Sequence, residues 1–510
     1  MFKTLSAETL AQVNQLTQGN AFKAGGISTG LGLVAYNLEP TAKLLVPEFS
    51  PLRTEIPRVT PPGNLAGLQP NWKQLTSFNS ANIKPYVTEG NRGALISYTE
   101  ANKSAAYVTH GLENNATFEA ESAAIGFDNI DDLATLGLLN EFFAQEERQI
   151  IGGNIGLALG QTATPTLTAE ATGGSLPGSG SLYVACVALS FDGWDLTNTS
   201  GKVNQTISQA NAGPYGGTTV FNAGSAIISA IATVSLSSAN GSVVATVASQ
   251  LGAVGYAWFW GTNNTTLLQF GGVSTINSMN ITATVTGQQL FTSLTASVDY
   301  SQAYVSGTTT ALAYDGLLSQ TAQGGYTYTM PTGTVGVGGA GTGLTPAASG
   351  QGIGIVEFDN LLAYMWNTYR SSIGEILVSS QELNNITNKL LSAGSAPLMR
   401  FNYDRGNQSN VLGGTMVGEY LNKFAFGGPQ IIPIKLHPYI PYGTVLFRPT
   451  KVPYQISNVG TILRMNCRRD DYQLQWPLVT RQREWGIYNE TVLQNYAPFM
   501  FAKITNIANK

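Results

Sequence analysis

The clearest pattern of apolar and polar positions in the chain is a helical one, over residues 128–153. Apolar residues recur there at roughly helical spacing and form a wide face: Ile130, Leu133, Leu136, Phe142, Phe143, Ile150 and Ile151. Asp128 is placed to cap the first turn, and Gly152-Gly153 can turn left-handed and end the helix. At ~1.5 Å per residue the helix is a rod of roughly 35 Å. The rest of the chain is arranged around it.

The residues before this helix predict an extended arm and then a hairpin. Residues 5–18 favour a short helix, and five prolines between Pro47 and Pro62 bias the following segment towards extended conformations. Within 68–125, short segments have strand character and are separated by turn residues: 86–87, 95–98, 106–108 and 117–119. These strands are too polar to form their own core. We expect a hairpin that packs on a partner, with a flexible surface loop as the alternative.

The pattern changes sharply after the helix. Between Pro165 and Asp299, Lys202 is the one basic residue, and short alternating runs are separated by Gly and Pro clusters. Short strands at regular intervals predict a β-sandwich, of Ig-like or fibronectin-III-like type. Two of its strands are apolar on both faces, as expected of buried strands. One strand presents Tyr183, Ala185 and Val187 on one face, and the other presents Tyr256, Trp258 and Trp260.

A mixed pattern follows the sandwich. Residues 355–370 predict a helix, 374–379 a buried strand, and 381–394 a second helix that Ser379 and Glu382 can cap. The glycine-rich segment 334–354 has no following Lys-Ser/Thr, so we interpret it as a loop and not as a nucleotide site. This sequence of helix, strand and helix indicates a small α+β domain that the sandwich interrupts.

The C-terminal part predicts long strands and carries the chain's concentration of basic residues: Arg464, Arg468, Arg469, Arg481 and Arg483. One interpretation is a solvated strand face on which these arginines pair with Asp470, Asp471 and Glu484. The other is a set of salt bridges between subunits, or a face towards nucleic acid. The sequence leaves both open.

The composition of the chain limits the classes of protein to which it can belong. The chain has 510 residues, of which 11% are charged and 57 are glycine, which favours several β-rich units with much surface buried against other chains. The net charge of -4 argues against strong non-specific DNA binding. Two distant cysteines, Cys186 and Cys467, predict no disulfide framework and a reducing compartment. We find neither a signal-peptide pattern nor an apolar run long enough for a membrane span.

Catalytic chemistry has little support in the sequence. The two histidines, His110 and His437, accompany no nucleophile elbow and no cluster of metal ligands, so we expect them in loops or interfaces. Paired carboxylates for glycoside hydrolysis are available in any chain with 30 acidic residues, but no pattern brings two of them together. We therefore expect no catalytic, cofactor or metal site.

The order of elements resembles the major capsid protein of tailed bacteriophages, which has the Hong Kong 97 capsid fold. The similarity lies in 45–59, 68–125, 128–151, 313–320, 355–391 and the ending 432–507. It implies an α+β chain divided into an N-terminal arm (1–50), a segment entering the P-domain (51–67), an E-loop (68–126), a spine helix (127–153), the A-domain start (154–163), an inserted Ig-like sandwich (164–299), the A-domain (300–435) and the P-domain C-terminal strands (436–510).

The resemblance implies a structural protein of the virion that assembles in the host cytoplasm into an icosahedral shell around double-stranded DNA. Its partners would be other copies in pentamers and hexamers, a separate scaffolding protein, a portal, decoration proteins and weakly bound DNA, with no membrane. The candidate interface residues are Phe49, Leu52, Arg53, Trp72, Tyr86, Tyr98, Arg468, Arg469, Trp476, Arg481 and Arg483.

Two features depart from the minimal family pattern. The sandwich is an addition, which we expect to face outward for stabilisation or attachment. A fused scaffolding segment before the arm is not evident. Some members cross-link a Lys to an Asn, for which Lys84 or Lys103 and Asn458 or Asn466 are weak candidates. The alternatives to a capsid protein are a tail, fibre or surface adhesin that binds through the sandwich, and a carbohydrate-active enzyme.

Overall fold

A computed structural model gives the three-dimensional structure of the chain. It describes residues 50–60, 67, 69–77, 85–93, 95, 99–124, 129–212, 216–239, 241–262, 268–332, 341–348, 354–392, 417–450 and 460–509. The helix predicted over 5–18 and most of the glycine-rich segment lie outside the described residues, as do Phe49, Lys84, Tyr98, Asp128 and Asn458.

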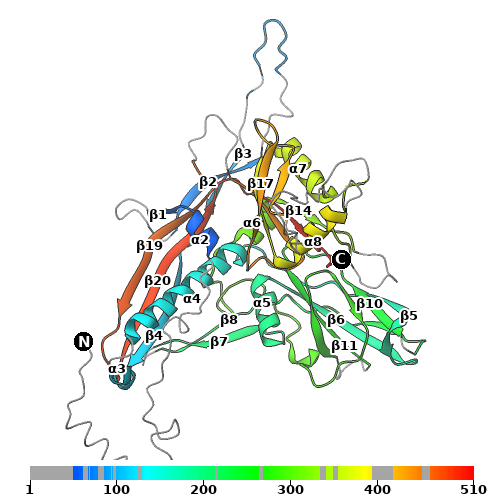
Figure 1. The fold of residues 1–510 in the computed structure, drawn as a ribbon, viewed down its shortest axis with the longest axis horizontal. Coiled ribbons are helices and arrows are strands. Elements are labelled where there is room, and N and C mark those ends of the chain that lie inside the picture. Colours follow the sequence, from blue (N-terminus) through cyan, green and yellow to red (C-terminus); the bar gives the residue numbers. More distant parts are fainter. Residues whose placement is uncertain are drawn as a thin grey trace, which may run out of the picture.

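The predicted central helix is confirmed as α4 (Ile130–Gly152), which lies along a sheet of long strands (Figure 1). The strands of this sheet follow the order β1 (Arg58–Val59), β19 (Leu463–Gln475), β20 (Gln482–Asn495) and β4 (Val108–Thr117). Leu138 and Phe142 of α4 pack on Trp485 and Ile487 of β20. The helix therefore buries its apolar face against strands that come from both ends of the chain.

Part of the region expected to form a hairpin packs on its own chain. The hairpin itself consists of β2 (Asn71–Ser77) and β3 (Thr99–Ser104), and β4 then pairs with β20. The predicted strand over 117–119 is wrong, because β4 ends at Thr117 and α3 (Phe118–Ala124) begins there. Alanine and glutamate favour this helix, and the Thr117 hydroxyl accepts from the backbone N–H of Ala120 at 3.3 Å. Residues 86–87 belong to no strand.

A second, six-stranded sheet forms the other main layer. Its order is β14 (Tyr326–Thr329), β21 (Ala502–Thr505), β18 (Val445–Pro449), β15 (Ile373–Val378), β17 (Gln430–Leu436) and β16 (Glu419–Asn422). Helices α6 (Leu317–Gly324), α7 (Val356–Tyr369) and α8 (Ser380–Ser392) accompany it, with the short η5 (Pro498–Met500). Phe358 of α7 packs against Phe447 of β18, with ring centroids 5.1 Å apart. The predicted helices at 355–370 and 381–394 and the strand between them are confirmed.

Residues 436–510, expected as one set of strands, divide between the two sheets. β18 and β21 lie inside the six-stranded sheet, whereas β19 and β20 belong to the sheet below α4. The physical reason is the burial of the strands. All five residues of β18 are buried, as a central strand requires, whereas β19 becomes exposed beyond Cys467. An A-domain boundary at 435 therefore does not coincide with a sheet boundary.

The segment predicted as a sandwich has two antiparallel sheets around a shared core. One sheet has the order β13 (Ser278–Ile281), β10 (Gly241–Thr246) and β5 (Thr166–Leu176); the other has β12 (Gln269–Ser274), β11 (Gly255–Gly261), β6 (Ser181–Leu189) and β9 (Ala232–Ser235). Trp258 and Val243 meet in the core between them. The kinship of this sandwich with Ig-like domains stays a prediction.

The same segment contains elements that the alternation pattern did not predict. Helix α5 (Phe191–Ser200) follows β6, the strands β7 (Thr206–Ala210) and β8 (Thr218–Asn222) form a separate hairpin, and η4 (Phe291–Ser293) closes the far side. Phe259 packs beside Phe291, so the sheet of β6 and β11 is covered on both faces. This double cover explains why both strands are apolar on both sides.

The C-terminal end of α4 and the N-terminal end of α8 differ in detail from the predicted caps. Gly153 caps α4 with φ -51° and ψ 138°, so a left-handed turn is not why glycines stand there. A Cβ on Gly152 would lie 2.0 Å from the Phe191 ring, and one on Gly153 would lie 2.2 Å from the carbonyl oxygen of Tyr314. Both glycines permit close packing at the end of the helix. At α8, the Ser379 hydroxyl accepts from the backbone N–H of Glu382 at 3.3 Å, which confirms half of the predicted capping box.

A pair of glycine substitutions in α4 tests this packing. We expect Gly152→Ala to destabilise the protein by about 1–3 kcal/mol, because the new methyl group must displace the buried Phe191 ring. Gly137→Ala is the matched control, since nothing lies within 4 Å of its Cβ, and it should stabilise the helix by about 0.5–1 kcal/mol. Thermal unfolding of both variants is the measurement. An unchanged midpoint for Gly152→Ala would contradict the close contact.

Candidate assembly interface

A buried carboxylate, Glu147 of α4, holds the start of the described chain. Glu147 is fully buried, and its oxygens accept the backbone N–H groups of Leu52 at 2.9 Å and of Arg53 at 2.7 Å. These two groups begin α2 (Pro51–Glu55), where N–H groups lack partners within the helix. The Nε2 atom of His437 lies 2.7 Å from the same carboxylate. Glu147 therefore joins three segments that are far apart in the sequence.

The adjacent carboxylate, Glu146, neutralises two arginines. Arg53 Nε lies 2.6 Å and Arg58 Nη1 2.8 Å from its oxygens. Both arginines also reach the acidic pair of β19: Arg58 lies 2.7 Å from Asp470, and Arg53 contacts Asp471. The Arg53 guanidinium stacks 3.6 Å above the Phe143 ring of α4. We call Arg53, Arg58, Glu146, Glu147, His437, Asp470 and Asp471 the arm anchor.

The charges in the arm anchor stabilise one another. Burial alone would lower the pKa of Arg58, but its hydrogen bond to Asp470 and the charge of Glu146 outweigh burial and raise it. Burial alone would raise the pKa of Asp470, yet the hydrogen bond from Arg58 holds that pKa below its usual range. Arg58 and Asp470 therefore stay charged at neutral pH, as a buried ion pair requires.

The structure places several predicted interface residues inside the chain. Leu52 is 1% exposed, and Arg53 lies in the arm anchor. The indole N–H of Trp72 donates to the carbonyl of Asn495 at 3.1 Å. A sequence cannot distinguish a partner within the chain from one in a neighbour. The anchor itself had a signal that was missed, because Glu147 falls on the apolar face of the helix, between Phe143 and Ile150–Ile151.

The arginines that are concentrated in the C-terminal strands contact other residues of the chain, and most of these residues lie on other elements. Arg468 pairs with Glu490 of β20, and Arg469 lies 5.7 Å from the Tyr472 ring. Arg481 meets Glu119 of α3 at 2.8 Å, and Arg483 meets Asp131 of α4 at 2.8 Å. Asp470 and Asp471 face the arm anchor instead. Three of the five arginines are therefore ion-paired within the described chain, with acids other than Asp470, Asp471 and Glu484. The exposed pairs contribute little to stability.

The expected loop position is confirmed for His437, which follows β17 outside any strand, and is wrong for His110, which lies within a strand. His110 belongs to β4, with its ring 5.7 Å from that of Tyr314. Burial lowers the pKa of His110 to about 4, the charge of Arg58 adds to this, and a hydrogen bond with Gln149 opposes it. His437 is 1% exposed within the arm anchor. Among the described residues no group of three or more His, Cys, Asp or Glu side chains could hold a metal ion.

Large apolar side chains reach solvent at separate places on the chain. The first set, the hairpin tip, joins β19 to β20 and includes Trp476 and the most exposed member, Leu478, at 64%. Its members are Leu474, Trp476, Leu478 and Val479. Figure 1 places this hairpin beside α3, at the end of α4 far from the six-stranded sheet. Exposed apolar clusters of this kind mark sites of protein contact.

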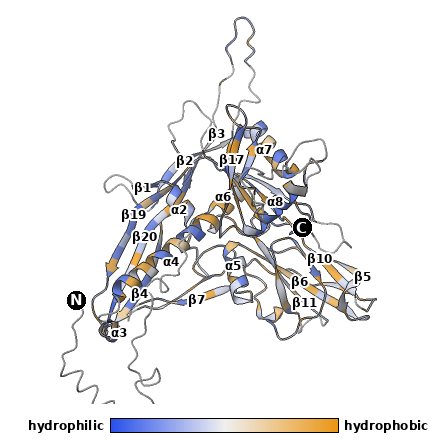
Figure 2. Cartoon of the chain, in the orientation of Figure 1, coloured by the Kyte–Doolittle hydropathy of each residue, from blue (hydrophilic) through white to orange (hydrophobic). Residues whose placement is uncertain are grey.

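The second set, the sheet-edge face, lies on β16, on β17 (labelled in Figure 2) and in the turn between them, at the edge of the six-stranded sheet. Leu421 and Ile431 stand directly opposite each other in the register, and Ile431 is 66% exposed. Its members are Leu421, Phe426, Ile431 and Leu436. Tyr86 and Leu95 in the long loop between β2 and β3 are 84% and 92% exposed. The chain thus presents apolar surface in at least three directions.

Comparisons with known proteins find solved structures that are similar to this chain at low sequence identity and low TM-score. No family model matches the sequence, and no curated protein matches it. The chain aligns over 99% of its length with 98% of a chain from the satellite phage P4 procapsid including size determination (Sid) protein, at 8% identity and a TM-score of 0.34. It aligns over 97% with 98% of a chain from the capsid of the native GTA particle, at 8% identity and a TM-score of 0.36.

A chain from Gordonia phage Cozz aligns over 96% of its length with 95% of this chain, at 10% identity and a TM-score of 0.36. Scores this low do not establish a common fold, so the assignment of arm, E-loop, spine helix, P-domain and A-domain stays a prediction. None of the helices in the described parts of the chain is long and apolar enough to cross a membrane.

Removing the Glu147 carboxylate tests the arm anchor. We expect Glu147→Ala to destabilise the protein by about 3–5 kcal/mol, because two backbone N–H groups and His437 lose their common acceptor in a buried site. Trypsin should also cleave after Arg53 and Arg58 faster than in the wild type. Glu141→Ala, on the exposed side of the same helix, should change stability by less than about 0.5 kcal/mol. Equal cleavage rates in all three proteins would refute the anchor.

Proposed function

We propose that the chain is the major capsid protein of a phage head, in which many copies close into an icosahedral shell around double-stranded DNA. The observation that carries the proposal is the pair of exposed apolar surfaces, the hairpin tip and the sheet-edge face, at separate ends of one chain. Exposed apolar surface is unfavourable at ~25 cal/mol per Å². A contact between the two different surfaces gives each copy two neighbours.

The arrangement of these surfaces supports a closed assembly. Two different surfaces on one chain make a head-to-tail contact, which closes into a ring when the rotation between copies allows it. Rings of five and six copies are the units from which we expect the shell to form. The arm anchor supports this function because it connects β19, which leads to the hairpin tip, with His437, which follows the strand β17 of the sheet-edge face.

The inserted sandwich is proposed to face outward. Figure 1 places it on the side of α4 opposite to the β19–β20 sheet. Between residues 165 and 299 the sequence has four acidic residues and one basic residue, a net charge of 1 − 4 = −3. DNA would repel such a domain, so an exterior position is favourable. The same low basicity supports only weak contact between the inner surface of the shell and the packaged DNA.

The proposed role is structural and includes no catalytic step. A separate scaffolding protein, a portal and decoration proteins are proposed partners, because a single chain type must be guided to one shell size and needs an opening for DNA. The alternative function is a tail, fibre or adhesin protein. The self-contained cores on both faces of the β6–β11 sheet favour it, since a binding module needs an independent fold.

Single charged substitutions on the two apolar surfaces test the proposed function. We expect wild-type protein to form rings or closed shells, seen by negative-stain electron microscopy after expression alone or with a neighbouring scaffolding gene. Val479→Asp and Ile431→Asp should each abolish assembly, because a buried unpaired carboxylate is strongly unfavourable. The thermal unfolding midpoint of the isolated subunit should change little in either variant.

The matched control is Ile231→Asp, which places the same charge at an exposed apolar position of the outward-facing insert. It should leave assembly intact. Slender trimers or monomers of the wild type under every condition would refute the shell and favour the adhesin. Shells formed by both Val479→Asp and Ile431→Asp would show that the two apolar surfaces are not the contacts.

A further inference from the structure

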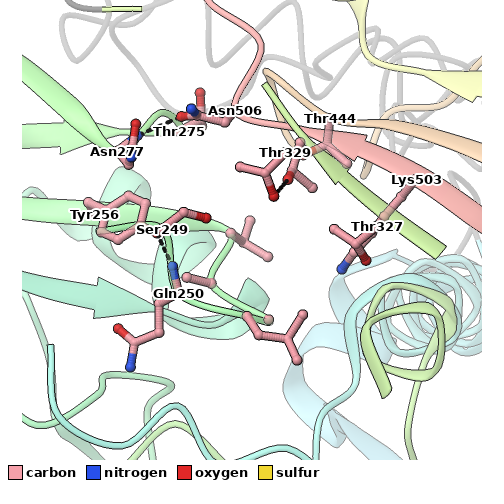
Figure 3. A pocket seen from close by; sticks show the side chains of 15 residues that line it. Ser249, Gln250, Tyr256, Thr275, Asn277, Thr327, Thr329, Thr444, Lys503 and Asn506 are labelled. Carbon is pink, nitrogen blue, oxygen red and sulfur yellow. Dashed lines mark hydrogen bonds between the residues drawn. The ribbon is translucent and has the colours of Figure 1, made fainter. Parts of the chain in front are cut away.

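A polar cavity of about 230 Å³ lies where the inserted sandwich meets the six-stranded sheet (Figure 3). The sandwich contributes the loop 249–254 and the side chains of Tyr256, Thr275 and Asn277. The sheet contributes residues of β14, of β21 and of the turn before β18. The cavity therefore joins two parts of the chain whose own cores are apolar, and its polar lining calls for an explanation.

The polar side of the cavity follows from the register of the sheet. β14 and β21 pair in parallel, with Thr327 opposite Lys503 and Thr329 opposite Thr505. Because side chains alternate along a strand, these four residues share one face. The other face of β21 carries Ala502 and Ile504, which lie in the apolar core with α7. One side of a central strand is thus polar where the opposite side is fully apolar.

Lys503 is the unusual group in this cavity. Its side chain is buried, with 4% of the residue exposed, and its amine donates to the carbonyl of Leu318 at 2.9 Å. No carboxylate among the described residues pairs with it, and burial lowers the pKa of Lys503 to about 8. An ammonium group has three N–H donors, so two of them are available to another acceptor.

Hydroxyl groups gather beside this amine. Figure 3 shows Lys503 next to Thr327, with Thr329 and Thr444 further along the same wall. The Thr327 hydroxyl is covered from solvent and has no hydrogen-bond partner among the described residues. Buried polar groups are normally hydrogen-bonded, so this hydroxyl is available to a molecule that enters the cavity.

We propose that this cavity binds a small inorganic oxyanion, such as phosphate or sulfate, through Lys503 and the threonine hydroxyls of β14 and β21. A cation does not fit, because the one charged group that lines the cavity is itself a cation. An apolar ligand would leave the Thr327 hydroxyl and two of the three N–H donors of Lys503 without partners. An oxyanion supplies several acceptors and the negative charge that the buried amine lacks.

The bound ion would brace the insert against the body of the chain. The two parts already meet there through the backbone N–H of Asn277, which donates to Asn506 Oδ1 at 2.7 Å. Asn506 in turn donates to the carbonyl of Met330 at 2.7 Å. An ion held between the loop 249–254 and the sheet adds contacts to both sides of this junction. This site is independent of the proposed shell, because it lies within one chain.

Titration calorimetry of the full chain with inorganic phosphate tests the site. We expect about one phosphate per chain, and a saturable rise in the thermal unfolding midpoint that sodium chloride at equal ionic strength does not reproduce. Lys503→Met should weaken phosphate binding about ten- to a hundredfold, because a charge-assisted hydrogen bond is lost. Thr327→Val, which keeps the shape of the side chain, should weaken phosphate binding several-fold. This variant tests the site if Lys503→Met does not fold.

Lys202→Met is the matched control, because Lys202 is exposed on the insert, and it should bind phosphate as the wild type does. Titration with the dinucleotide thymidylyl-thymidine identifies the source of the oxyanion. Binding of phosphate but not of the dinucleotide supports a free ion, and Lys503-dependent binding of both supports a site that also takes a nucleic-acid phosphate. No binding of either, or equal binding by Lys503→Met and the wild type, would overturn the proposal.

The pH dependence gives a second readout. The pKa of Lys503 is about 8 in the folded chain, against a usual value near 10.5, so the unfolded chain holds more protons between these values. The stability of the ion-free wild type should therefore rise with pH across this window, and this rise should be smaller in Lys503→Met. The stabilisation by phosphate should instead decrease above pH 8, as the amine loses its charge. A phosphate effect that is unchanged up to pH 10 would contradict the role of Lys503.

Discussion

The fold depends on two adjacent carboxylates buried in the middle of the molecule. Glu146 and Glu147 lie on α4, where an unpaired charge would cost several kcal/mol. Every partner that offsets this cost comes from a distant part of the sequence: α2, β1 and the residue after β17. The acids of β19 then pair with the same two arginines. The network is therefore satisfied only when the start, middle and end of the chain are assembled together. Apolar packing alone would not fix which segments meet at this point.

This constraint has a consequence for the exposed surfaces. The hairpin tip extends beyond the anchored part of β19, and the sheet-edge face lies on β17, which ends next to His437. Both apolar sets are thus connected to the arm anchor through short, hydrogen-bonded segments. A partner that covers them meets a preformed surface and does not have to order it, which reduces the entropic cost of association.

The sequence predicted elements whose periodicity is strong and local. Helices α4, α7 and α8 and the strand β15 have clear apolar patterns, and each was found close to its predicted position. The sequence did not predict α5, whose Asp, Thr and Gly residues are weak helix formers. Nor did it separate β18 and β21 from β19 and β20, since sheet membership depends on contacts between distant residues. The partners of Leu52 and Trp72 within the chain could not be predicted for the same reason, because they lie far along the sequence.

The geometry around the C-terminal end of α4 explains how a large insert coexists with this closely packed centre. The two connections to the sandwich run side by side, because Gly160 N–H donates to Asp299 at 2.7 Å and Ala303 N–H donates to the Asn154 carbonyl at 2.8 Å. The N–H of Gly316 then donates to the Gly153 carbonyl at 2.7 Å, directly at the end of the helix. The insert therefore leaves and re-enters at nearly one point, so its folding imposes little strain on the arm anchor. Its remaining contacts with the body, among them the cavity of Lys503, are where the two parts influence each other.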